Sequence, residues 1–318
     1  MYEKKFQVYL WSCTIKAFCR SLGVNPIPLK TCNYSCVYCQ LGRTKNFTNQ
    51  RRSFFKRELI LSEIKEAVNK FNNEIDYITF VGEGEPLLSK DIGYLIQKVR
   101  EFTEIKTALI TNGALLMLEE VRREVLPFHV ISPTLDAGSE RVFKLINRPF
   151  KGIKLSDVVN GFINLRKEYK GEIWIEIMLV KGLNDTEEEL KRIRNLLDKI
   201  SPHRVYVNVP IRPPAEKWVE IPDKEGIDRA KRILKNAVFI NMEEKGIFEG
   251  REFKTPEEAI LFLTRRHPMR LDQILESIKG FNRDELLDSL NKLIKQGRLK
   301  KISYRGKEFY LPSESKFS

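Results

Sequence analysis

The sequence predicts an α/β protein in which strands alternate with helices and form a parallel sheet. Six short runs rich in β-branched and aromatic residues occur between residues 21 and 209, and amphipathic stretches of helical length separate and follow them. Strands that alternate with helices build right-handed βαβ units and therefore a parallel sheet. In such folds the chemistry is placed at the carboxyl ends of the strands.

The individual elements follow from these runs. The predicted strands are Ser21–Pro28, Ile75–Val81, Lys106–Thr111, Phe128–Leu135, Ile173–Val180 and Arg204–Val209. The predicted helices are Leu59–Phe71, Lys90–Phe102, Leu115–Val125, Leu155–Tyr169, Thr186–Ile200 and Lys224–Leu234. Asp185 is the expected cap of the fifth helix, whose first turn is acidic and suits the positive end of the helix dipole.

Three cysteines within eight residues follow the first predicted strand: Cys32, Cys36 and Cys39, with the spacing C-x3-C-x2-C. Three thiolates on one loop can hold three irons of a cubane iron–sulfur cluster and leave the fourth iron open for a small molecule. The alternative is a zinc site, which usually takes four Cys or His ligands. The other candidate ligands are scattered along the chain: Cys13, Cys19, His129, His203 and His267.

A second motif, Gly82-Glu-Gly-Glu-Pro86, directly follows the second predicted strand. Glycines at a strand end let the backbone approach a ligand closely. Together with the cysteine spacing, this run resembles the signature of the radical SAM superfamily. The resemblance implies a partial (βα)6 barrel, a 4Fe-4S cluster on the three cysteines and S-adenosyl-L-methionine on the open iron.

The same resemblance implies further cofactor contacts. Tyr38 is expected near the adenine; the alternative is a loop aromatic packed on the core. The motif Gly82, Glu83, Gly84, Glu85 and Pro86 is expected to bind the amino end of S-adenosylmethionine. The remaining expected contacts lie at the ends of later strands: Asn112, Ser132, Asp136 and Met178, with weaker support for Glu176. Asp136 could instead cap a helix. Asn208 and Arg212 are candidates for contact with the substrate.

The charge of the chain favours polyanionic partners. Its 56 Lys and Arg residues exceed its 43 Asp and Glu residues, which gives a net charge of +13. A basic surface attracts tRNA or DNA, although heat-adapted proteins also carry solvated basic surfaces. The chain has no apolar run suited to a membrane span or a secretory signal, so we expect a cytoplasmic protein without membrane contact.

The last part of the chain differs from the rest. Helices are predicted over Thr255–Arg266, Leu271–Ile278 and Asn282–Gln296, followed by strands over Leu299–Tyr304 and Glu308–Leu311. Three helices and a hairpin resemble a winged helix, a module that often binds nucleic acid. The acidic start of the third helix speaks against base contacts, so packing on the barrel or on a protein remains open. We therefore expect an N-terminal segment at 1–20, a radical SAM core at 21–250 and a winged-helix-like domain at 251–318.

Longer sequence segments indicate which group within the superfamily the chain resembles. The segment from Ser21 to Cys32, Ile146-Asn-Arg-Pro149 and Arg212-Pro-Pro214 are similar to radical SAM Fe–S oxidoreductases related to the wyosine-base synthases that modify tRNA. Those synthases carry a second cluster on three more cysteines, and this chain retains two others. The sequence of residues Trp11–Phe18 also differs from that of the group. If the gene uses suitable codons for these residues, reading them one base later gives the sequence typical of the group. A pair of compensating frameshifts is one hypothesis, which resequencing the gene decides.

These features predict an enzyme that reductively cleaves S-adenosylmethionine and abstracts hydrogen from a substrate. Its electron donor would be a flavodoxin or ferredoxin. tRNA or another nucleic acid is the leading substrate class, with a protein or small metabolite still open. The alternatives are a winged-helix DNA-binding regulator that senses the cluster or S-adenosylmethionine, and a degenerate member without catalysis.

Overall fold

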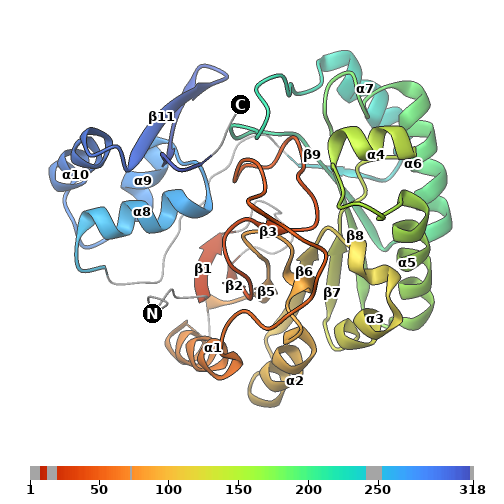
Figure 1. Cartoon of the computed structure of the whole chain (residues 1–318), viewed down its shortest axis with the longest axis horizontal. Coiled ribbons are helices and arrows are strands. Elements are labelled where there is room, and N and C mark those ends of the chain that lie inside the picture. Colours follow the sequence, from red (N-terminus) through yellow and green to blue (C-terminus); the bar gives the residue numbers. More distant parts are fainter. Residues whose placement is uncertain (1–7, 13–19, 72–73, 241–252, 316–318) are drawn as a thin grey trace.

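The computed structural model describes residues 8–12, 20–71, 74–240 and 253–315, and its centre is one curved sheet (Figure 1). The order of its strands is β1-β2-β5-β6-β7-β8-β9-β10. The six predicted strands are present, parallel and in sequence order: β2 (Arg20–Val24), β5 (Tyr77–Phe80), β6 (Lys106–Thr111), β7 (Val130–Pro133), β8 (Glu172–Met178) and β9 (Arg204–Asn208). The predicted parallel α/β fold is confirmed.

Two strands that the sequence did not predict extend the sheet at its edges. β1 (Val8–Ser12) pairs with β2 in the antiparallel sense, and β10 (Val238–Phe239) pairs with β9 in parallel. A separate small ladder joins β3 (Thr31–Cys32) to β4 (Asn46–Phe47). The strand order has two ends and the sheet does not close, which agrees with the expected partial barrel.

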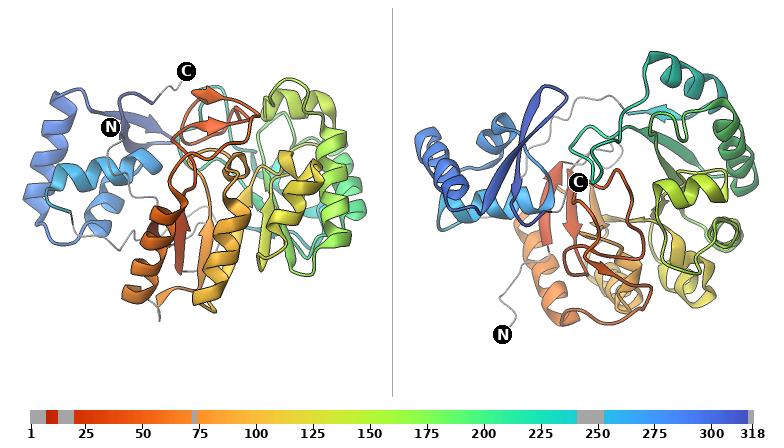
Figure 2. Two further views of the ribbon diagram at one scale, coloured as in Figure 1. Left: turned by 60° about the horizontal axis from the view of Figure 1, so that its bottom comes forward. Right: turned by 45° about the horizontal axis from the view of Figure 1, so that its top comes forward.

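Helices cover the outer side of this sheet (Figures 1 and 2). Their bounds are α1 (Arg57–Phe71), α2 (Ile92–Phe102), α3 (Glu119–Val125), α4 (Glu140–Ile146), α5 (Leu155–Glu168), α6 (Glu187–Ile200) and α7 (Lys224–Ile233), with 3-10 turns at Pro86–Leu88 and Ala114–Met117. Helix α4 was not predicted. The predicted cap of α6 was wrong: the Thr186 side chain accepts from the amide of Glu189, while Asp185 accepts from Gly182.

The core lies between the sheet and these helices. Side chains such as Phe80 on β5 and Phe162 on α5 are fully buried there. Since all six central strands run in one direction, their carboxyl ends meet along one edge of the sheet. The cysteine loop, the Gly82–Pro86 motif and the polar strand ends therefore come together at this edge, although they are far apart in the sequence.

The C-terminal part has its own small core. Helices α8 (Pro256–Arg266), α9 (Leu271–Ser277) and α10 (Arg283–Lys295) precede the antiparallel hairpin of β11 (Leu299–Tyr304) and β12 (Lys307–Pro312). The predicted three helices and hairpin are confirmed, as are the Thr255 cap and the Asn282–Glu285 capping box. We call residues 253–315 the C-terminal module.

Several predictions fall on residues outside the described ranges. Cys13, Cys19, most of the segment proposed to be frameshifted and the predicted domain boundary at residues 250–251 are among them. Within the described ranges, no helix has the length and apolar character needed to cross a membrane.

Candidate cofactor site at the carboxyl end of the sheet

The cysteine loop presents three free thiols, those of Cys32, Cys36 and Cys39, all half-buried. Burial raises the pKa of each thiol, and the neighbouring thiols raise those of Cys32 and Cys36 further. No group of three or more His, Cys, Asp or Glu side chains in the described ranges is arranged around a single metal ion. Three thiols that repel one another as thiolates need a positively charged partner to ionise together.

Nitrogen donors point at two of these sulfurs. The backbone amide of Tyr34 lies 3.3 Å from Cys32 Sγ, and the Asn112 side-chain amide lies 3.7 Å from the same atom. The Asn147 side-chain amide lies 3.6 Å from Cys36 Sγ. Donors of this kind stabilise negative charge on sulfur and tune the potential of iron–sulfur clusters. The donor set therefore fits a cluster held by the three thiolates.

Neighbouring segments hold the loop in place. Cys32 pairs with Phe47 in the β3–β4 ladder, and the amide of Val37 donates to the carbonyl of Ile146 at 2.9 Å. The Thr44 hydroxyl donates to the carbonyl of Tyr34 at 2.6 Å. The loop is therefore connected to the fold on both sides.

Gly84 allows the Gly82–Pro86 motif to lie in close contact with the cysteine loop. A Cβ atom on Gly84 would lie 1.9 Å from the carbonyl oxygen of Thr31, the residue before Cys32. The amide of Glu85 donates to that same oxygen at 3.0 Å. Gly84 therefore lets the motif pack directly against the cysteine loop, and Pro86 begins the 3-10 turn that follows.

Glu85 connects neighbouring segments of the site through hydrogen bonds. Its buried carboxylate accepts from the Thr111 hydroxyl at 2.5 Å, the Asn112 amide at 2.7 Å and the Leu87 amide at 2.9 Å. Burial raises its pKa to about 7, against these three donors. The Asn112 side chain then donates to Asn33 Oδ1 at 2.7 Å. Glu85 and Asn112 thus connect the ends of β5 and β6 to the cysteine loop.

Asp136 lies beside the loop and does not cap a helix, because the Ser139 side chain caps α4. Its Oδ2 accepts from the Tyr38 hydroxyl at 2.5 Å and from the Asn147 amide at 2.6 Å, and its Oδ1 accepts from the Met178 amide at 2.8 Å. Burial raises its pKa to about 6. The predicted contacts Tyr38, Asp136 and Met178 therefore form one hydrogen-bonded group.

Ser132 and Glu176 lie next to this group on β7 and β8. The Ser132 hydroxyl is buried and donates to the Trp174 carbonyl at 2.8 Å and to Glu176 Oε1 at 3.1 Å. Burial raises the pKa of Glu176 to about 7, and the nearby Asp136 adds to this shift.

The C-terminal module contacts this end of the sheet through residues that the sequence analysis missed. Arg266 Nε lies 3.5 Å from Glu83 Oε1. The Gln40 amide nitrogen donates to His267 Nδ1 at 2.9 Å, and Arg212 Nη1 donates to Gln40 Oε1 at 2.8 Å. His267 was treated as one of several scattered histidines, yet the fold brings it against the residue after Cys39. The contact between His267 and Gln40 depends on tertiary packing and has no signal in the local sequence.

The module also reaches the far edge of the sheet, where the Tyr304 hydroxyl donates to the Pro210 carbonyl at 2.8 Å, just past β9. It therefore contacts the loops that follow both β5 and β9. Burial, together with the charges of Arg212 and Arg266, holds the pKa of His267 well below its usual value.

Among the residues that sequence reasoning missed, Asn147 is central, because it donates to both Cys36 and Asp136. The run Ile146-Asn-Arg-Pro149 was noted for its resemblance to a family, which was the available signal for Asn147.

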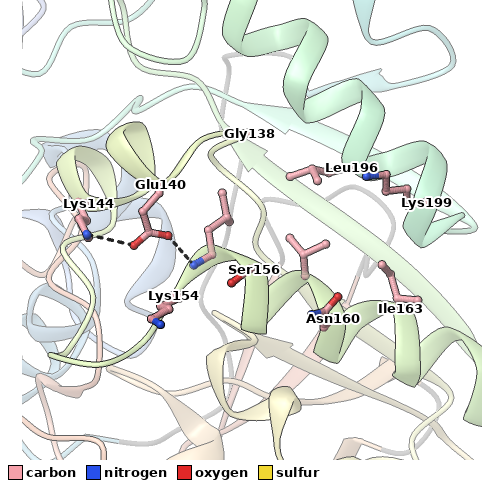
Figure 3. Close-up of a pocket in the computed structure, with 11 residues that line it drawn as sticks. Gly138, Glu140, Lys144, Lys154, Ser156, Asn160, Ile163, Leu196 and Lys199 are labelled. Atoms are coloured by element: carbon pink, nitrogen blue, oxygen red, sulfur yellow. Dashed lines mark hydrogen bonds and ion pairs between the residues drawn. The ribbon is translucent and has the colours of Figure 1, made fainter.

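A groove of about 640 Å³ lies elsewhere, on the outer side of the sheet between α4, α5 and α6 (Figure 3). Its lining includes Leu155, Leu196 and the lysines at 144, 154 and 199. None of the predicted cofactor contacts lines it.

Comparisons with known proteins agree with this site. The family model for the Radical SAM superfamily matches residues 27–197. A UPF0026 protein of Methanocaldococcus jannaschii is 40% identical over 297 residues, which cover 92% of each chain. A probable dual-specificity RNA methyltransferase of Endomicrobium trichonymphae is 26% identical, over 67% of this chain and 62% of that protein.

A solved structure shares the fold. The crystal structure of a radical SAM methyltransferase from Sphaerobacter thermophilus superposes with a TM-score of 0.54 at 17% identity, over 69% of this chain and 65% of that one. The family match spans more than half of the chain and includes the cysteine loop, the Gly82–Pro86 motif and Asp136. The chain therefore belongs to the radical SAM superfamily and, through its near-full-length similarity to the archaeal relative, to the UPF0026 proteins.

Proposed function

We propose that the chain is a radical SAM enzyme in which Cys32, Cys36 and Cys39 hold a 4Fe-4S cluster and the surrounding strand ends bind S-adenosylmethionine. The observation that carries the proposal is the arrangement of three free thiols on one anchored loop, with Asn112 and Asn147 donating to two of the sulfurs. A superfamily match over the same residues supports it.

When bound, the cluster supplies the electron that cleaves the sulfonium of S-adenosylmethionine, and the resulting 5′-deoxyadenosyl radical can take hydrogen from a substrate. The residues of this chain hold and enclose the reactants. Gly84 brings the motif against the cysteine loop, and Asp136 orients the Tyr38 ring through its hydroxyl. Packing of the C-terminal module over Glu83 and Gln40 limits the access of water.

The expected electron donor is a flavodoxin or ferredoxin, which the superfamily resemblance implies. The leading substrate class is nucleic acid, tRNA included. The net charge of +13, the similarity to a protein named as a probable RNA methyltransferase and the resemblance to wyosine-base synthases support it. We also propose that residues 251–318 form a winged-helix-like domain. A second cluster is not proposed, because Cys13 and Cys19 are the remaining cysteines of the sequence.

The test is anaerobic. The protein is reconstituted with iron and sulfide, reduced with dithionite and supplied with S-adenosylmethionine, and 5′-deoxyadenosine is measured by liquid chromatography and mass spectrometry. We expect the nucleoside from the natural protein and none from Cys36→Ala. The variant Leu126→Ala, exposed at the opposite edge of the sheet, is the matched control and should keep the activity.

A full, reducible cluster that yields no 5′-deoxyadenosine would contradict the proposal. It would favour a regulator or a degenerate member, and sequence-specific DNA binding would then distinguish these two.

A further inference from the structure

We propose that the surface beside the cysteine loop binds unpaired nucleotides of a nucleic acid by stacking them on exposed aromatic rings. This surface, which we call the aromatic rim, consists of Arg43, Phe47, Arg148, Phe150 and Trp218. The inference rests on the proposed function in one respect, because that function places the chemistry at the neighbouring cysteines.

The rim contains unusual side chains for a protein surface. Phe47 is 43% exposed and Trp218 is 52% exposed, and they are the exposed aromatic residues among the side chains that the structure describes. Phe150 packs against Phe47 with the ring centroids 5.2 Å apart. Exposed apolar groups that lie together on a surface, rather than singly, mark sites of interaction.

Both exposed rings are attached to the cysteine loop. Phe47 is the partner of Cys32 in the β3–β4 ladder. Trp218 lies in a turn where the amide of Glu216 donates to the carbonyl of Val37, between Cys36 and Cys39, at 3.1 Å. The rim is therefore anchored beside the proposed cluster rather than on a remote part of the molecule.

Charged residues join the two aromatic parts into one surface. Arg148, two residues before Phe150, pairs with the buried Glu216, two residues before Trp218. Arg43 pairs with the same carboxylate through Nε at 2.8 Å and Nη2 at 2.9 Å. The Phe47–Phe150 ring contact, the Arg148–Glu216 ion pair and the short chain segments 148–150 and 216–218 therefore link Phe47 to Trp218.

The charge of the rim is positive. Arg43 and Arg148 keep 49% and 38% of their side-chain surface exposed and share a single carboxylate, and the exposed Lys217 follows it in the sequence. Two guanidinium groups on one acid leave excess positive charge, and guanidinium groups bind phosphate well.

Aromatic faces beside guanidinium groups fit one class of partner best. Single-stranded nucleic acids stack their bases on aromatic rings while basic side chains bind the phosphates. A duplex hides its base faces, and an acidic peptide would satisfy the arginines but leave the rings without a matching surface. The occupant we infer is therefore a single-stranded or looped segment of nucleic acid.

Trp218 makes the inference testable by fluorescence. The chain has three tryptophans, and Trp174 is 3% exposed. The reconstituted protein is titrated anaerobically with a short oligouridylate, with the same strand in a duplex and with an acidic peptide. We expect quenching of Trp218 by the single strand, and no such change in Trp218→Phe, which should still bind the strand by fluorescence anisotropy.

Affinity changes then test the individual rings. Phe47→Ala and Trp218→Ala should each weaken binding of the single strand roughly 5- to 150-fold, because a stacked base contributes about 1–3 kcal/mol. Arg43→Gln should lower the slope of log affinity against log salt by about 1. Leu126→Ala should bind as the natural protein does, since Leu126 lies at the opposite edge of the sheet.

The inference is overturned if the single strand does not bind, if the duplex or the acidic peptide binds more tightly, or if neither aromatic substitution weakens binding. The measurement is independent of the radical chemistry. Formation of 5′-deoxyadenosine without oligonucleotide binding would remove this inference alone, and binding without that product would remove the proposed function alone.

Discussion

Arg266 at the end of α8 and Glu83 in the Gly82–Pro86 motif form an ion pair, with 3.5 Å between Nε and Oε1 and about a tenth of each side chain exposed. The pair joins the C-terminal module to the motif expected to bind S-adenosylmethionine. The next residue, His267, accepts a hydrogen bond from the Gln40 side-chain amide. The module is therefore connected to both motifs that carry the family signature.

Breaking this pair from one side should destabilise the protein. Arg266→Met leaves the buried Glu83 carboxylate without its guanidinium, and Glu83→Gln does the reverse, each at a cost of about 1–3 kcal/mol. The double variant should lose less than the sum of the two, as measured by urea unfolding. The exposed Arg265→Met is the control and should change stability by about 0.5 kcal/mol or less. Strict additivity would show that the two residues do not interact.

Gly84 should tolerate no side chain. A Cβ there would lie 1.9 Å from the Thr31 carbonyl oxygen, a backbone atom next to Cys32, so Gly84→Ala must displace the cysteine loop. We expect the variant to bind less iron after reconstitution, read from the cluster's visible absorbance. The comparison is Gly93→Ala on α2, where the nearest atom to the new methyl would be Glu124 Cγ at 3.0 Å, a side-chain atom. Equal iron content in the two variants would contradict the prediction.

Much of the fold could be predicted from the sequence because its signals are local. Alternating strand and helix patterns define the βαβ units. The helix caps at Thr255 and Asn282 are recognised from residues at most three positions away in the sequence. Shorter or less regular elements were missed. Helix α4 has seven residues, too few for a clear apolar period, and Asp185 and Thr186 are adjacent residues that can both act as caps.

The site was predictable where residues close in sequence act together, as the three cysteines do. It was not predictable where distant residues meet. Asn147 reaches Cys36 across 111 residues, and His267 reaches Gln40 across 227. An asparagine or a histidine carries no local signal for such a partner, because the contact depends on how the loops and the C-terminal module pack.

The two cysteines outside the motif should not be needed for the cluster. If the frameshift hypothesis holds, Cys13 and Cys19 are accidental, so a variant with both changed to Ala should keep about four irons per chain after reconstitution. Cys39→Ala should lose most of them, since one of the three proposed ligands is gone. Iron and sulfide assays on matched samples give the comparison. Loss of additional iron from the double variant would indicate a second metal site.

Glu176 should make stability depend on pH. Its pKa is raised to about 7 in the folded protein, mainly by burial, against about 4.5 for an exposed glutamate. Between these two values the folded state keeps a proton that the unfolded state has lost, so this residue makes the protein less stable as pH rises. The effect is absent below the lower value and levels off above the higher one.

Glu176→Gln removes that cost, because the amide is never charged and can still accept from Ser132. We expect equal stability for the variant and the natural protein near pH 4.5. Above pH 7 the variant should be more stable by on the order of 1–3 kcal/mol, since one pKa unit corresponds to about 1.4 kcal/mol. Anaerobic thermal unfolding at the two pH values measures the difference, with the exposed Glu188→Gln as the control. A variant that is less stable than the natural protein above pH 7 would mean that the ionised Glu176 is stabilised by a partner, and burial would not then be the dominant influence on this carboxyl.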